Sequence, residues 1–172
     1  MDKDINIGDC QLMFGDCLEI MKDIPDRSVD LTVTSPPYDN LRTYNGNIAQ
    51  WSFDKFHQIA KELYRVTKEG GVDVWNVNDA TIKGDETGSS FRQALFFKEC
   101  GFNLHDTMIW IKDGGGAVGS NKCYTQNFEY MFVFSKGSPK SINLIYDKPN
   151  KDRKSTRLNS SHSAKSRMPS SA

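Results

Sequence analysis

Residues 29–38 read VDLTVTSPPY, an apolar run that two prolines interrupt at once. Residues 29–33 have the length and the β-branched composition of a buried strand. The two prolines lack the N–H that a sheet ladder needs, so the strand must end before them. The hydroxyl of Ser35 and the ring of Tyr38 therefore lie together at the carboxyl edge of a strand. In an open α/β sheet, ligands bind at this edge.

The rest of the chain alternates between strand and helix patterns. Apolar residues recur at helical spacing over residues 53–66, and we expect Gly70 and Gly71 to end that helix with a left-handed cap. No crossover helix separates the last two apolar runs, so they can pair antiparallel. The alternation predicts an α/β fold with a mostly parallel sheet flanked by helices. The expected strands are 11–14, 29–33, 72–77, 104–112 and 128–135, and the expected helices are 17–22, 53–66 and 91–100.

The composition excludes several classes of protein. The chain has 172 residues, of which 22 are basic and 22 acidic, and this length suits one domain with its own core. No apolar run reaches membrane-spanning length and no secretory signal opens the chain, so we expect a cytoplasmic protein with no membrane partner. The four cysteines form no CxxC pair, which predicts reduced thiols and no metal site.

Residues 34–38, TSPPY, resemble motif IV of the DNA amino-methyltransferases, which methylate the exocyclic amine of cytosine or adenine. An isolated Pro-Pro-Tyr is usually a loop or a polyproline segment that a partner domain binds. Here, further segments resemble the other family motifs, in the order of the β class. They are GDCLE at 15–19 (motif III), LYRVTKEGG at 63–71 (motif V), NVND at 76–79 (motif VI) and NFEY at 127–130 (motif VIII). The chain thus resembles the N-terminal part of a β-class enzyme.

The resemblance implies a partial Rossmann-like methyltransferase sheet. The family has one antiparallel strand near the end of its sheet, which here implies an antiparallel terminal hairpin. The family's Phe-x-Gly-x-Gly cofactor loop has no counterpart in this sequence. We therefore expect the C-terminal cofactor-binding strands to be missing. The strand before Ser35 would then have an unpaired edge.

The family motifs assign roles to residues that this sequence shares. Catalysis must localise the lone pair of the target amine, and hydrogen-bond acceptors do this. By resemblance, the Ser35 hydroxyl and the Pro36 carbonyl are these acceptors, and Pro37 makes the segment rigid. Tyr38 would stack on a base that is flipped out of the duplex, and Asn76 would line the base pocket.

The methyl donor that the resemblance implies is S-adenosylmethionine. Asp16, Cys17 and Thr34 are the candidate cofactor-binding residues. Asp16 has a competing structural interpretation, because aspartate also caps helix N-termini. Glu129 and Trp75 are expected to pack or to support the site rather than to take part in the reaction.

The implied substrate is double-stranded DNA in a bacterium or phage, and a cognate restriction endonuclease would be a second partner. The serine in the first position of motif IV favours cytosine-N4 over adenine-N6. No Pro-Cys dipeptide occurs, which excludes the cysteine nucleophile of the C5-cytosine enzymes. The glutamine methyltransferases of release factors also carry Pro-Pro-Tyr, but their glycine-rich cofactor loop precedes it. The 34 residues before Ser35 contain no such loop.

Residues 152–172 differ in character from the rest of the chain. The segment DRKSTRLNSSH at 152–162 is polar, basic and aperiodic, which predicts disorder. Together with SRMPSSA at 166–172, it resembles the translation of a common DNA-sequencing adapter. We expect residues 1–151 to be the catalytic portion of a methyltransferase domain, cut near Lys151 and inactive by itself. The tail holds five basic residues and one acidic residue, so the remainder is net acidic and has no overall basic surface for DNA.

Overall fold

The computed structural model describes residues 4–38, 51–113 and 126–142. The chain divides into two units, Met1–Lys140 and Ser141–Ala172, and all described helices and strands belong to the first. The predicted tail at 152–172 lies outside the described residues. No helix in the described part of the chain is long and apolar enough to cross a lipid bilayer.

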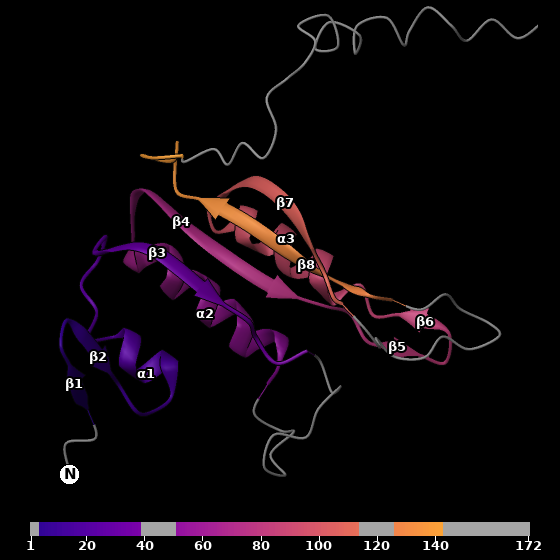
Figure 1. Cartoon of the computed structure of the whole chain (residues 1–172), viewed down its shortest axis with the longest axis horizontal. Coiled ribbons are helices and arrows are strands. Elements are labelled where there is room, and N and C mark those ends of the chain that lie inside the picture. Colours follow the sequence, from indigo (N-terminus) through magenta and orange to yellow (C-terminus); the bar gives the residue numbers. More distant parts are fainter. Residues whose placement is uncertain (1–3, 39–50, 114–125, 143–172) are drawn as a thin grey trace, which may run out of the picture. The chain divides into compact units, whose positions relative to one another are not determined.

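The described elements follow the predicted alternation of strands and helices (Figure 1). The helices are α1 (Cys17–Met21), α2 (Phe53–Val66) and α3 (Ser89–Glu99). The strands are β1 (Ile5–Ile7), β2 (Cys10–Leu12), β3 (Val29–Thr34), β4 (Thr67–Val77), β5 (Thr81–Ile82), β6 (Asp85–Glu86), β7 (Asn103–Ile111) and β8 (Phe128–Ser135). Each predicted helix and strand is present, whereas the short strands β1, β5 and β6 were not predicted.

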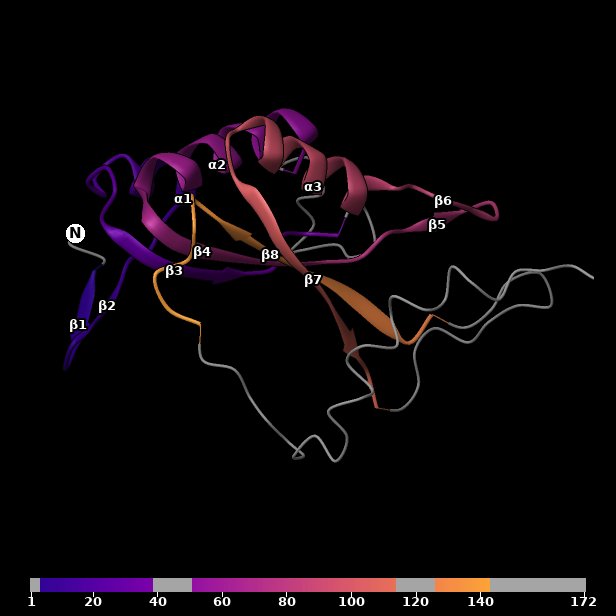
Figure 2. The same cartoon turned by 90° about the horizontal axis from the view of Figure 1, so that it is seen from above.

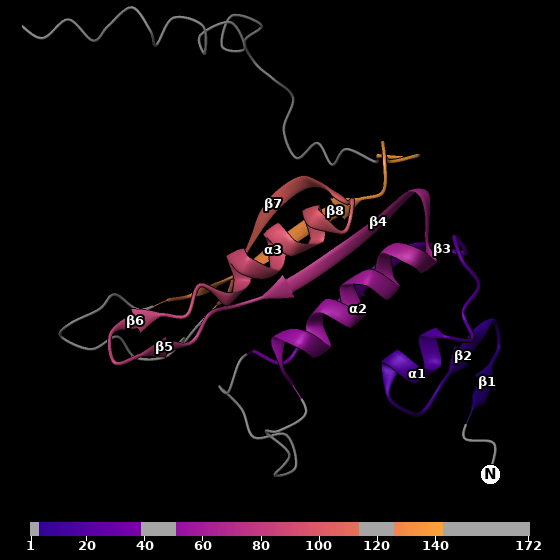
Figure 3. The ribbon, with the colours of Figure 1, turned by 180° about the vertical axis from the view of Figure 1, so that it is seen from behind.

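Four strands form the sheet that carries the candidate site, in the order β3-β4-β8-β7. Strands β3 and β4 are parallel, and β8 is antiparallel to both β4 and β7. This arrangement confirms the α/β fold and the antiparallel terminal hairpin. The predicted mostly parallel sheet is not seen among the described strands, because only one of their three pairings is parallel. Helices α2 and α3 cover one face of the sheet (Figure 2), and the view from behind shows both of them in front of the strands (Figure 3).

The core lies between these two helices and the sheet. Helix α2 begins after Ser52, whose side chain accepts a hydrogen bond from the backbone N–H of Lys55 at 3.1 Å. The apolar face of α2 is buried, as its spacing predicted. The ring of Phe97 on α3 stacks on Phe134 of β8, with 4.5 Å between the ring centroids. The buried core includes Phe56, Ile59, Ala60, Leu63, Trp75, Phe97, Phe132 and Phe134.

The junction between α2 and β4 corrects the prediction of a glycine cap. Helix α2 ends at Val66, and Thr67 is already extended, so neither predicted glycine ends the helix. The Thr67 hydroxyl donates to the Leu63 carbonyl at 2.7 Å, and the buried Lys136 ammonium donates to the Thr67 carbonyl at 3.0 Å. These contacts satisfy carbonyl groups at the end of the helix. Gly70, with a φ of +79°, lies inside β4 instead.

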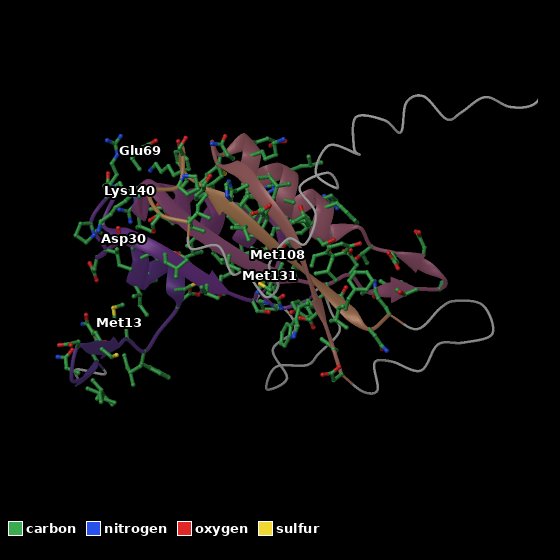
Figure 4. The ribbon with its side chains drawn as sticks, turned by 45° about the horizontal axis from the view of Figure 1, so that its top comes forward. Met13, Asp30, Glu69, Met108, Met131 and Lys140 are labelled. Carbon is green, nitrogen blue, oxygen red and sulfur yellow. The ribbon has the colours of Figure 1, made fainter. Side chains whose placement is uncertain are left out.

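Strand β3 is less buried than its apolar sequence predicted. Leu31 and Val33 are 58% and 68% exposed on the face of the sheet opposite α2 and α3, which we call the open face. Met108 of β7 and Met131 of β8 pair in register and lie together on this face (Figure 4). A continuously apolar strand is typical of a sheet that is covered on both faces, and the described residues cover only one. Among the described strands β3 pairs with β4 alone, and the expected open edge of β3 stays a prediction.

Asp79 fixes the start of α3 to the end of β4. The residue before the helix is Gly88, which has no side chain to cap it. The buried Asp79 carboxylate takes this role, since it accepts hydrogen bonds from the Ser90 backbone N–H at 2.8 Å and from the Ser89 hydroxyl at 3.1 Å. Part of the segment that resembles motif VI therefore has a structural role.

Asp73 on β4 should make the stability of this chain depend on pH. Its side chain is 2% exposed, and burial raises its pKa to about 6 from an ordinary value of 3.8. Between these two values the folded chain holds the proton more tightly than the unfolded chain. Stability should therefore fall as the pH rises from about 4 to 6 and stay level above that. We expect Asp73→Asn to remove this loss and to raise the free energy of unfolding at pH 7 by roughly 3 kcal/mol.

Urea unfolding of the chain at a series of pH values would measure this effect. Asp85→Asn on β6 is a suitable control, because Asp85 is exposed. An Asp73→Asn chain that keeps the pH dependence of the unmodified chain would show that Asp73 is not its source.

Candidate active site

Three adjacent strands bring polar side chains to one end of the open face. Because β3 and β4 are parallel, Ser35, just past the end of β3, lies beside the end of β4. Side chains alternate along a strand, so the burial of Trp75 against the helices directs Asn76 to the open face. Asn76 pairs in register with Met131, which places Glu129, two residues away on β8, on the same face.

Five side chains form a hydrogen-bonded group that we call the polar cluster: Ser35, Tyr38, Asn76, Lys112 and Glu129. The Ser35 hydroxyl donates to the Tyr38 hydroxyl at 3.0 Å, and the Tyr38 hydroxyl donates to Oε2 of Glu129 at 2.8 Å. Nδ2 of Asn76 donates to the Tyr38 oxygen at 2.9 Å and to Oε2 of Glu129 at 2.5 Å. Nζ of Lys112 forms an ion pair with Oε1 of Glu129. The structure thus brings three of the predicted site residues together.

The charges in the polar cluster follow from its contacts. Glu129 is 4% exposed, and burial alone would raise its pKa. Hydrogen bonds from Lys112, Tyr38 and Asn76 outweigh burial and lower the pKa of Glu129 below its ordinary value. Burial is also the main reason that the pKa of Tyr38 rises to about 12. At neutral pH, Glu129 is therefore a carboxylate and Tyr38 keeps its proton.

The diproline connects the end of β3 to Tyr38. Pro36 is buried, Pro37 and Tyr38 are half-buried, and Ser35 is exposed. Each proline ring fixes its own φ, so the segment has little freedom. An accessible hydroxyl is therefore held in a fixed place beside the tyrosine. Thr34, the last residue of β3, is half-buried, and its predicted contact with a cofactor stays a prediction.

Asp16 and Cys17 lie at the start of α1, away from the contacts of the polar cluster. The Asp16 carboxylate accepts a hydrogen bond from the Leu18 backbone N–H at 2.9 Å and forms an ion pair with Lys55 at 2.7 Å. The hydrogen bond from Lys55, followed by that from Leu18, lowers the pKa of Asp16. The competing interpretation of Asp16 as a helix cap is confirmed. Cys17 is an exposed free thiol, and a cofactor role for either residue stays a prediction.

Lys112 is the site residue that the sequence did not identify. Glu129 was expected to pack or to support the site, and it does support the site, because it accepts hydrogen bonds from three members of the polar cluster. The signal available for Lys112 was its position at the end of a strand that was expected to pair with the strand that carries Glu129. Trp75 packs as expected, and its indole N–H donates to Gln93 at 2.8 Å. The described residues contain no group of side chains suited to hold a metal ion.

A model of the N6_N4_Mtase family, described as DNA methylase, matches residues 29–170. The chain belongs to this family. The match includes the segments that resemble motifs IV, V, VI and VIII, and it confirms the resemblance to the DNA amino-methyltransferases.

The chain is also similar to individual methyltransferases. It is 64% identical over 130 residues to the orphan methyltransferase M.BamHII of Bacillus amyloliquefaciens, which covers 76% of this chain and 47% of that protein. It is 30% identical over 163 residues to the type II beta methyltransferase M.BslI of Bacillus sp. (strain NEB-606), with 78% of this chain and 17% of that protein covered. The chain therefore spans about half the length of M.BamHII and less of M.BslI.

Solved structures of DNA methyltransferases share the fold. The cytosine-N4-specific PvuII DNA methyltransferase matches with a TM-score of 0.63 and 22% identity, over 86% of this chain and 61% of that chain. TTHA0409 is a putative DNA modification methylase of Thermus thermophilus complexed with S-adenosyl-L-methionine. It matches with a TM-score of 0.56 and 24% identity, over 77% of this chain and 57% of that chain. These likenesses confirm that the sheet is part of a methyltransferase fold.

The cap at the start of α1 can be tested by its effect on stability. We expect Asp16→Ala to lower the free energy of unfolding by about 1 kcal/mol, because it removes both the cap and the ion pair with Lys55. Asp16→Asn keeps an oxygen for the cap and loses only the charge, so its cost should be below about 0.5 kcal/mol. Urea unfolding of the two variants separates these contributions. Equal losses would mean that the ion pair with Lys55, and not the cap, supplies the stability.

Proposed function

We propose that the protein to which this chain belongs transfers a methyl group from S-adenosylmethionine to the exocyclic amine of a base in double-stranded DNA. The observation that carries this proposal is the polar cluster at the end of β3. It holds the exposed Ser35 hydroxyl beside Tyr38, inside a segment of the family's catalytic motif. Membership of the DNA methylase family supports the same reaction.

The residues of the motif suit the chemistry of amine methylation. The exocyclic amine of cytosine or adenine is a poor nucleophile, because its lone pair is delocalised into the ring. Acceptors that bind the amine hydrogens localise the lone pair and direct it toward the methyl donor. The Ser35 hydroxyl and the Pro36 carbonyl would be these acceptors. The transfer is direct, so no covalent intermediate on the protein is needed.

Tyr38 would stack on the flipped base. Its hydroxyl is bound by three partners, Ser35, Asn76 and Glu129, and its side chain is half-buried. The ring is therefore fixed before a base arrives. Stacking on such a ring offsets part of the cost of unstacking the base.

The described residues would form only part of a site for S-adenosylmethionine, which supplies the methyl group when it is bound. Thr34, Asp16 and Cys17 are the candidates. Both oxygens of the Asp16 carboxylate already have partners, Leu18 and Lys55, so a cofactor hydroxyl would have to replace one of them. The outer edge of β3 is unpaired among the described strands. This supports the proposal that strands outside the described residues supply the rest of the cofactor site. TTHA0409 and M1.HpyAVI, two solved relatives in fold, are complexes with this cofactor.

Cytosine-N4 is the favoured target and adenine-N6 the alternative. Ser35 supplies a neutral hydroxyl in the first position of the motif, where a carboxylate or an amide is more usual for adenine. The natural partner would be double-stranded DNA in the cytoplasm of a bacterium. A cognate restriction endonuclease is a further proposed partner, and the similarity to M.BslI, a type II enzyme, supports it. The similarity to M.BamHII does not support it, because M.BamHII is an orphan methyltransferase.

The catalytic assignment can be tested in the full-length protein. We expect Ser35→Ala and Tyr38→Ala to lower the rate of DNA methylation by about 100-fold or more, because one loses the acceptor and the other the stacking ring. Ser138→Ala, at an exposed serine beyond β8, is the matched control. Mass spectrometry of digested DNA measures the rate and separates N4-methylcytosine from N6-methyladenine. Near-normal methylation by either alanine variant would refute the assignment.

We also propose that the 172-residue chain by itself binds S-adenosylmethionine poorly. Its part of the sheet leaves one edge of β3 and the open face without described partners. Isothermal titration calorimetry of the chain should therefore detect no binding at micromolar concentrations. A micromolar dissociation constant would contradict the proposal and would place a complete cofactor site within this chain.

A further inference from the structure

Three side chains of the polar cluster direct hydrogen-bond donors at Glu129. They are the Tyr38 hydroxyl, the Asn76 amide and the Lys112 ammonium. The Glu129 carboxylate is buried and has acceptors only. A group that can only accept fixes the direction of every hydrogen bond that reaches it.

Through Tyr38, Glu129 also fixes the direction of the hydrogen bond that Ser35 makes. Tyr38 gives its one proton to Glu129, so its oxygen is available to Ser35 only as an acceptor. Ser35 in turn gives its one proton to Tyr38, so only lone pairs remain on the outer side of its oxygen. Because Ser35 is exposed, a ligand can reach these lone pairs.

Asn76 is oriented by the same carboxylate. Its Nδ2 donates to Tyr38 and Glu129, which determines which end of the amide faces the cluster. Its Oδ1 is buried and has no hydrogen-bond partner among the described residues. Glu129 therefore sets the direction of the Asn76 amide as well as that of the Tyr38 hydroxyl.

We propose that Glu129 is a positioning residue that acts through Tyr38 and holds the Ser35 hydroxyl as a pure acceptor for one hydrogen of an exocyclic amine. This inference rests on the proposed function, because it concerns the base that the site would methylate. An amino group supplies a donor to the Ser35 oxygen. A keto group would bring an oxygen against the Ser35 oxygen and leave both unpaired, so the site rejects keto bases.

Replacing the carboxylate by an amide should reverse the direction. In Glu129→Gln, the amide oxygen would face Lys112, which can only donate, and the amide NH₂ would face Tyr38 and Asn76. Tyr38 would then give its proton to Ser35, and Ser35 would point a proton at the substrate amine. The variant keeps the size of the side chain and its contacts while it removes the acceptor from Ser35.

Steady-state kinetics of the full-length enzyme test this role. We expect Glu129→Gln to lower kcat by about 10- to 100-fold and to change KM for DNA by less than about threefold. Glu99→Gln, at an exposed position on α3, is the matched control and should keep the kcat of the unmodified enzyme. Tyr38→Phe keeps the ring but interrupts the path, so its loss should be similar. Combining Tyr38→Phe with Glu129→Gln should add little, because both changes break one path.

Lys112 gives a readout that a purely structural role would not change. Lys112 and Tyr38 are the titratable groups that contact Glu129. Lys112→Met removes the ammonium that lowers the pKa of Glu129, so that pKa should rise. As the pH is lowered, the kcat of this variant should fall at a higher pH than the kcat of the unmodified enzyme does. Lys112→Arg keeps the cation and should restore the pH profile of the unmodified enzyme.

The outcomes separate the inference from the proposed function. If the unmodified enzyme methylates DNA amines and Glu129→Gln keeps its kcat, the positioning role is wrong while the function stands. If the folded, unmodified enzyme does not methylate DNA, both are wrong. If Glu129→Gln fails to fold, Lys112→Met provides the test. The inference is wrong if the kcat of Lys112→Met has the same pH dependence as the kcat of the unmodified enzyme.

Discussion

The parallel pairing of β3 with β4 is the constraint on which the candidate site depends. In the observed register Val33 lies opposite Val74 and Thr34 opposite Trp75, so Ser35 leaves the sheet next to Asn76. A shift of β4 by one residue would turn Asn76 toward the helices and Trp75 toward the open face. The indole of Trp75 opposes such a shift, because it is buried among core rings and donates a hydrogen bond to Gln93. Core packing on one face of the sheet thereby positions polar groups on the other.

The connection from α2 into β4 fixes the same strand from its other end. Thr67 binds the last turn of the helix, and Lys136 reaches across from the end of β8 to the carbonyl groups of Tyr64 and Thr67. Helix, strand and hairpin are therefore held at one point with no flexible loop between them. A site built on such a rigid connection can keep a hydroxyl in place to the precision that catalysis requires.

The sequence predicted those features that depend on neighbouring residues. The diproline ends β3 by local chemistry, and the periodicity of α2 is visible within its own 14 residues. Features that depend on distant partners were not predicted. Glu129 is 91 residues from Tyr38 and 53 from Asn76, so no local sequence pattern predicts its hydrogen bonds with these two residues. The predicted glycine cap at Gly70 was wrong for a related reason, because tertiary contacts of Thr67 end α2 before any glycine is needed. The exposure of Leu31 and Val33 was likewise not predicted, because an apolar strand does not reveal how many of its faces are covered.

The composition of the open face separates the polar cluster from the rest of the sheet. Along β3, β4 and β8 this face carries Val33, Val74 and Val133 in one row, and the polar cluster follows at the carboxyl end of the parallel strands. A buried carboxylate there weakens folding unless its partners satisfy it, and apolar residues of similar size usually serve stability as well or better. Glu129 and Lys112 are therefore poorly explained as parts of the scaffold. The end of the sheet at which they occur is where an α/β fold binds its ligands, so their presence is better explained by the ligand than by the fold.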